Sequence, residues 1–139
     1  MTDVHDKATR SFNMSQIKGK DSKPEMVVRK FLFSRGFRYR THCKKLPGKP
    51  DIVLPKYKAV IFVHGCFWHG HDDCKYFVIP QTRTDWWLAK IAGNKVRDLR
   101  NQLELKAKKF TVLSIFECQL KTNMREQTLN SLLKHLSNQ

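Results

Sequence analysis

Apolar residues along the chain follow two different spacings, and these spacings predict its secondary structure. A helix begins after Ser22, which can act as N-cap, with Pro24 in the first turn and Glu25 three residues after the cap, as a capping box requires. Gly36 can end this helix. Its apolar stripe consists of Met26, Val27, Val28, Phe31 and Leu32.

Short alternating or continuous apolar runs predict the strands. FRYRTHC at residues 37–43 alternates and predicts a strand with one basic face. DIVL, opened by Asp51, and AVIFVH, which ends at His64, predict two more strands. FTVLSIFE at residues 110–117 predicts another, with Cys118 at its end.

Two further helices complete the predicted order. Thr84 can cap a helix over residues 85–109, interrupted at Gly93 and Asn94, and residues 124–136 form an amphipathic helix. The order helix, three strands, helix, strand, helix predicts an α/β fold with a mixed central sheet flanked by helices. With 139 residues and no linker, we expect one domain at residues 22–139 behind a polar, basic N-terminal arm at residues 1–21.

The charge of the chain indicates its class of partner. Lys and Arg number 27 against 12 Asp and Glu, a formal net charge of +15 that attracts nucleic acids through counterion release. An anionic membrane is the rival partner, but no basic amphipathic helix, lipid signal or signal peptide stands out. The longest clean apolar run, at residues 59–63, is too short to cross a bilayer. We expect a cytoplasmic protein without a membrane partner.

The stretch HGCFWHGHDDC at residues 64–74 is dense in metal-ligand side chains. Cys66, His71 and Cys74 are close enough in sequence to surround one ion, and Cys118 could supply a fourth ligand from the end of a neighbouring strand. Three thiolates and one imidazole suit a closed, structural zinc site. In the alternative interpretation, Cys43 and Cys118 are ordinary buried thiols and the loop histidines are merely polar.

Asp51 and His64 lie at the ends of neighbouring predicted strands, so a short turn can bring them into one cleft. Asp51 could hold Mg²⁺ with carbonyls and waters, while His64 or His69 moves protons and Glu25 reaches the hydrated ion. Each also has a structural alternative. Asp51 could be a turn residue, His64 a hydrogen-bonded core histidine and Glu25 part of the capping box.

Several motifs together resemble one enzyme family over nearly the whole chain. The PD pair before a strand, turn and second strand resembles the PD-(D/E)xK nuclease pattern, but Phe62-Val63-His64 stands where that pattern has its second carboxylate and lysine. The combination of KATRSFNMSQIKGKDSKPE, LPGKPDIV, VIFVHGCFWHGHDDC, TRTDWWLAKI and ECQL resembles the very-short-patch-repair (Vsr) mismatch endonucleases.

The resemblance implies a restriction-endonuclease-like fold and a magnesium-dependent, strand-specific nick. The cut would lie on the 5′ side of the mispaired thymine in a T:G mismatch left by deamination of 5-methylcytosine. Val63 stands where the best-known member has threonine, so it could bind magnesium only through its backbone carbonyl. The implied active site is Asp51, His64 and His69 with Glu25 in support, and the implied zinc ligands are Cys66, His71, Cys74 and Cys118.

Phe67 and Trp68 lie between the candidate zinc ligands, in a loop too polar for a core element. Either they fold back into the protein, or they form a wedge that inserts into the base stack, which costs least at a mismatch. The resemblance supports the wedge and adds Trp87. Its neighbour Trp86 points in another direction on a helix, so one of the two could belong to the core.

The expected substrate is double-stranded DNA with a T:G mismatch, bound by a monomer at the nucleoid of a bacterial-type cell. The repair protein MutL, a repair DNA polymerase and a functionally linked cytosine-5 methyltransferase are further candidate partners. Two other functions stay open: a zinc-stabilised DNA-binding module without catalysis, and an ordinary double-strand restriction nuclease. The arm would contact DNA phosphates through Lys7, Arg10, Lys18 and Lys20, unless it is a solvated tail.

Overall fold

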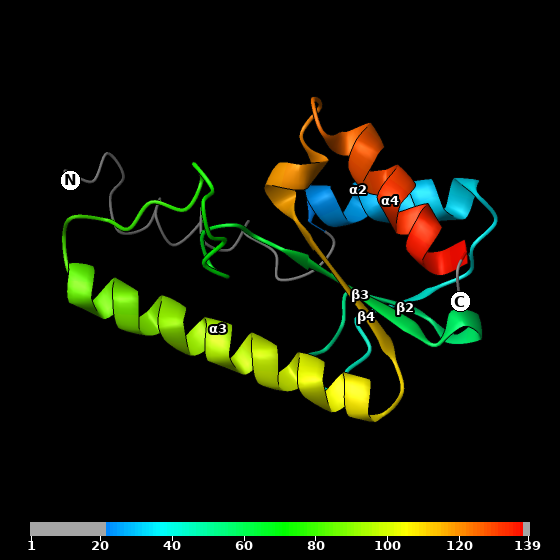
Figure 1. Ribbon diagram of the computed structural model, residues 1–139, viewed down its shortest axis with the longest axis horizontal. Coiled ribbons are helices and arrows are strands. Elements are labelled where there is room, and N and C mark those ends of the chain that lie inside the picture. The colour runs from blue at the N-terminus through cyan, green and yellow to red at the C-terminus, as the bar shows by residue number, and fades with distance from the viewer. Residues whose placement is uncertain (1–21, 138–139) are drawn as a thin grey trace, which may run out of the picture.

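The computed structural model describes residues 22–137 (Figure 1), so the arm residues Lys7, Arg10, Lys18 and Lys20 lie outside the described part of the chain. The predicted order of helix, three strands, helix, strand and helix is confirmed. The elements are α2 (Lys23–Ser34), β1 (Arg40–Thr41), β2 (Ile52–Leu54), η1 (Pro55–Tyr57), β3 (Ala59–His64), α3 (Thr84–Ala107), β4 (Thr111–Phe116), η2 (Glu117–Leu120) and α4 (Arg125–Ser137).

The four strands form one mixed sheet in the order β1-β2-β3-β4. β2 pairs antiparallel with β1 and with β3, whereas β3 and β4 pair parallel along their full six-residue lengths. β3 is therefore a central strand, which explains why its run AVIFVH is apolar and buried with little alternation. The mixed sheet confirms the predicted α/β class.

The helices lie on both faces of the sheet (Figure 1). α2 and α4 lie together on one side, and the long α3 crosses the other. Alternate residues of β3 supply both cores, because successive side chains of a strand point to opposite faces. Ala59 and Ile61 join the larger cluster with Val28 and Leu132, while Val60 and Phe62 join a smaller cluster with Leu105 of α3. Within residues 22–137, no helix is long and apolar enough to span a membrane.

The strand predicted at residues 37–43 is shorter than expected. Only Arg40 and Thr41 form a strand, and this strand ends where His42, with a backbone φ of 52°, turns the chain away.

The helix predicted to break at Gly93 and Asn94 is continuous, so that prediction was wrong. Asn94 is buried and its Nδ2 donates to the Trp68 carbonyl oxygen at 2.9 Å, a contact that offsets the small helical cost of one glycine. Thr84 is also not the cap. It is the first helical residue, and its hydroxyl donates to the carbonyl oxygens of Pro80 and Gln81.

Candidate active site and metal centre

A cavity of about 510 Å³ lies beside the end of β3. Asp51 and His64 meet there because Ile52 is in register with Ile61, which places the start of β2 beside the end of β3. α2 contributes Glu25, and the loop after β3 contributes His69. The structure thus brings together the four residues predicted for the active site. The complete lining is Ser22, Pro24, Glu25, Asp51, Val63, His64, Gly65, Trp68, His69 and Glu117.

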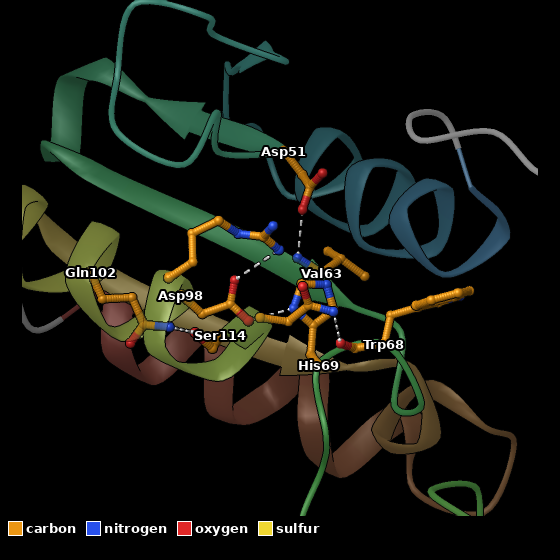
Figure 2. A network of polar contacts seen from close by, with 9 residues as sticks. Asp51, Val63, Trp68, His69, Asp98, Gln102 and Ser114 are labelled. Carbon is orange, nitrogen blue, oxygen red and sulfur yellow. Dashed lines mark hydrogen bonds and ion pairs between the residues drawn. The ribbon is translucent and has the colours of Figure 1, made fainter. Parts of the chain in front are cut away.

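Asp51 is held in place by its neighbours on both sides. Its Oδ2 accepts a hydrogen bond from the Val63 backbone N–H at 2.7 Å (Figure 2), and its carbonyl oxygen accepts one from the His42 N–H at 3.1 Å. Burial raises the pKa of the Asp51 carboxyl to about 6; the Val63 hydrogen bond opposes this rise, and the charge of Glu25 adds to it. Ionising the Asp51 side chain therefore costs free energy, and a bound cation would lower that cost.

Glu25 turns its carboxylate inward, where the side chain is only 2% exposed. Its backbone N–H donates to the Ser22 hydroxyl oxygen at 3.4 Å, so Ser22 caps α2 as predicted. The carboxylate has other neighbours: Oε2 lies 3.3 Å from Arg29 Nη1 and 2.9 Å from His42 Nε2. The Glu25 side chain thus belongs to the cavity, and the capping-box alternative does not account for its position.

The two predicted histidines lie together, with ring centres 4.1 Å apart. His69 Nδ1 is 2.6 Å from Oδ2 of Asp98 on α3 (Figure 2). A carboxylate at Nδ1 orients the ring and leaves Nε2 for proton transfer. Burial lowers the pKa of His64 to about 4, and the charge of His69 lowers it further while Asp98 raises it. His64 is therefore neutral at physiological pH.

The sequence prediction missed Asp98 and His42. Asp98 follows the buried Asn94 by four residues on α3, and small polar residues at this spacing on a buried helix face are a signal that could have found it. His42 had no comparable signal, because its position depends on the turn out of β1.

The four predicted zinc ligands form a cluster. The ligand atoms of Cys66, His71, Cys74 and Cys118 all lie within 4.8 Å of one another, so the cluster could hold a metal ion. Cys118 reaches it because β4 runs parallel to β3 and ends beside it, with Phe116 paired to His64. Burial raises the pKa of the Cys66 thiol to about 12, so a bound cation is needed to keep it as a thiolate.

The loop between these ligands is fixed against α3. Lys95 Nζ lies 2.9 Å from Asp72 Oδ1, and Asn94 holds the Trp68 carbonyl. Gly70 has a φ of +59°, and a Cβ there would lie 2.7 Å from Ile91 Cγ2. The close approach of loop and helix therefore requires glycine at this position.

Three aromatic residues gather beside the cavity. The Phe67 ring lies 5.3 Å from both the Trp68 and Trp87 rings, and the two tryptophans are 5.7 Å apart. Figure 2 shows the Trp68 ring extending away from His69. Trp68 and Trp86 are each 46% exposed and Trp87 is half-buried, so the expectation that Trp86 or Trp87 belongs to the core was wrong. A long helix lying across the sheet leaves its first turns beyond the core.

Comparison with known proteins identifies the family of the chain. A family model described as DNA mismatch endonuclease Vsr matches residues 2–75, a little over half of the chain. The chain is 49% identical over 137 residues to the type II nicking enzyme V.NmeAIP of Neisseria meningitidis serogroup A, covering 98% of this chain and 97% of that one. It is 44% identical to the type II nicking enzyme V.XorIIP of Xanthomonas oryzae pv. oryzae, covering 86% of this chain and 88% of that one. It is 46% identical to the DNA mismatch endonuclease Vsr of Escherichia coli K12, over 87% of this chain and 77% of that one. These matches confirm the resemblance seen in the motifs: the chain belongs to the Vsr family of DNA mismatch endonucleases.

Proposed function

We propose that this endonuclease nicks one strand of DNA on the 5′ side of the mispaired thymine of a T:G mismatch, and so starts very-short-patch repair. The observation that carries the proposal is the cavity in which Asp51 faces His64 and the His69–Asp98 pair, directly beside the exposed ring of Trp68. Such a site combines the groups for phosphodiester hydrolysis with a surface able to unstack bases. The names of the related mismatch endonuclease and nicking enzymes support it.

The oxygen donors of the cavity fit Mg²⁺. Asp51 supplies a carboxylate, and the Val63 N–H points toward it. In a strand the N–H and C=O of one residue face the same neighbour, so the Val63 carbonyl faces the Asp51 side as well. Glu25 lies beside Asp51 and would help to hold the ion. When bound, Mg²⁺ would polarise a phosphate oxygen and offset the charge that develops on it.

The histidines divide the proton chemistry between them. His69, with Asp98 at Nδ1, is suited to accept the proton of the attacking water because the carboxylate stabilises the cation that forms. His64 is kept neutral by burial and can donate a hydrogen bond from its ring N–H to a phosphate oxygen.

We assign Zn²⁺ to Cys66, His71, Cys74 and Cys118, since three thiolates and one imidazole leave no open position. The ion would be structural. Phe67, Trp68 and His69 all lie between its first two ligands in the sequence, so zinc would fix the wedge and the catalytic histidine through one loop.

The aromatic residues Phe67, Trp68 and Trp87 would enter the base stack. Unstacking costs a few kcal/mol per step and least where pairing is already defective, so a T:G mismatch is the favoured place of entry. The rest of the chain would form a single domain of restriction-endonuclease-like fold. The N-terminal arm at residues 1–21 would bind DNA phosphates through its basic side chains, Lys7, Arg10, Lys18 and Lys20. Action as a monomer, and the links to MutL, a repair polymerase and a cytosine-5 methyltransferase, stay predictions.

A strand-resolved nicking assay tests the substrate. Duplexes in several sequence contexts, each strand carrying its own fluorophore, are incubated with the zinc-loaded protein and Mg²⁺. We expect cuts only in the thymine strand of T:G duplexes, 5′ to the mispaired base. Equal cutting of both strands of paired DNA would instead identify a restriction nuclease, and tight binding without cutting would identify a binding module.

A further inference from the structure

His42 lies at the active-site carboxylates although neither the motifs nor the proposed mechanism uses it. The chain turns at His42 with a φ of 52°, a conformation that is uncommon for residues other than glycine. Its N–H donates to the Asp51 carbonyl oxygen, which anchors the turn. The imidazole therefore points back toward α2, where Nε2 lies 2.9 Å from Glu25 Oε2.

The three side chains have the separations of ligands around one ion. The ligand atoms of Glu25, His42 and Asp51 all lie within 4.8 Å of one another. With metal–ligand bonds of about 2.1 Å, ligands at right angles are about 3 Å apart and opposite ligands about 4.2 Å. The distance of 2.9 Å between Nε2 and Oε2 matches the first value. The other two pairs lie within 4.8 Å, close to the second value.

The charges at this point also favour a cation. Glu25 and Asp51 are two carboxylates at short distance in a site that is shielded from water, where like charges repel strongly. Arg29 Nη1 supplies one positive charge at 3.3 Å from Glu25, on the helix side. A divalent ion between the two carboxylates and the imidazole would balance the remaining charge.

We propose that His42 is a direct ligand of the catalytic divalent ion, and that the site consequently prefers Mn²⁺ to Mg²⁺. Mg²⁺ is selective for oxygen donors, whereas Mn²⁺ accepts an imidazole nitrogen beside carboxylates. Neutral imidazole is required, with its proton on Nδ1. This inference rests on the proposed function, because it concerns the ion of that nuclease site.

Pulsed electron paramagnetic resonance of bound Mn²⁺ tests the proposal without relying on activity. The zinc-loaded full chain is titrated with MnCl₂ alone, and the echo modulation is searched for coupling to ¹⁴N. We expect nitrogen coupling in the native protein and its loss in His42→Gln. His135→Gln, an exposed histidine on α4, is the matched control and should keep the signal. His42→Asn provides a second variant, since asparagine tolerates the positive φ better.

Metal affinities separate a ligand from a residue that only positions Glu25. Loss of a nitrogen ligand should weaken Mn²⁺ binding by roughly tenfold or more while changing Mg²⁺ binding much less. Equal weakening of both ions, or nitrogen coupling that persists in both His42 variants, would overturn the proposal. So would native protein that binds Mn²⁺ with no nitrogen coupling. The proposed function fails differently, through Mn²⁺ binding that is unchanged in Asp51→Asn or through absence of T:G nicking with either ion.

Discussion

Replacing Asp98 by asparagine removes one negative charge from the catalytic site while preserving the size of the side chain. The carboxylate lies 2.6 Å from His69 Nδ1, and the two side chains are only 18% and 25% exposed. When His69 accepts a proton, its hydrogen bond to Asp98 becomes one between two charged groups, and hydrogen bonds to charged groups are worth about 1.5–3 kcal/mol. Because about 1.4 kcal/mol corresponds to a factor of ten in rate, Asp98→Asn should slow nicking by roughly 10- to 150-fold.

Single-turnover nicking of a labelled T:G duplex, with protein in excess and saturating Mg²⁺, measures this effect. The affinity for the duplex, measured separately by fluorescence anisotropy, should stay within about twofold, because Asp98 contributes to the reaction and not to the DNA-binding surface. Asp85→Asn removes the same charge from the exposed first turn of α3 and serves as control. A nicking rate for Asp98→Asn equal to that of Asp85→Asn would refute a role of Asp98 in activating His69.

Four further perturbations test other parts of the site. Burial raises the pKa of Asp51 from 3.8 to about 6, so the ionised carboxylate destabilises the folded state above pH 6. Urea titrations of the metal-free protein should therefore show that Asp51→Asn raises the free energy of unfolding by up to about 3 kcal/mol at pH 8. The gain should vanish below pH 4, where Asp51 is protonated in both the folded and the unfolded state. Mg²⁺ binding requires the ionised form, so calorimetry should show its affinity falling as the pH drops through about 6; a constant affinity from pH 7 to 5 would contradict this assignment. Cys118→Ser should lower the zinc content measured by mass spectrometry well below one ion per chain and abolish nicking, whereas Cys43→Ser, outside the cluster, should retain both. Trp68→Ala should weaken binding to a T:G duplex by roughly 5- to 150-fold, the value of one stacked base, and leave binding to paired DNA nearly unchanged; equal losses on both duplexes would argue against a wedge.

The sequence predicted those parts of the fold that depend on local patterns. β3 is a run of β-branched and apolar residues, so its burial, and the position of His64 at its end, could be expected before the structure was known. Cys118 and the distant Cys66 could be predicted to share one metal site, because each follows a strand expected in the same sheet. The capping role of Ser22 likewise depends only on a few consecutive residues.

The parts that could not be predicted depend on how distant elements are oriented. Whether Glu25 caps its own helix or enters the cavity is decided by the rotation of α2 against the sheet. Asp98 meets His69 because the loop after β3 lies against an uninterrupted α3. The sequence instead suggested a break at Gly93, because the contact that Asn94 makes with this loop cannot be seen in the spacing of residues along the helix. His42 reached the carboxylates through a turn that ends β1 early.

The most direct test of the account compares binding and cutting in Asp51→Asn. The substitution retains the shape of the side chain but removes the negative charge of the carboxylate, which faces the cavity and accepts a hydrogen bond from the Val63 N–H. The variant should bind a T:G duplex as tightly as the native protein and cut its thymine strand at least a thousandfold more slowly, as expected for loss of the several kcal/mol by which a bound metal ion stabilises the charge of the transition state. Cutting at the native rate would show that the phosphodiester bond is broken elsewhere on the protein.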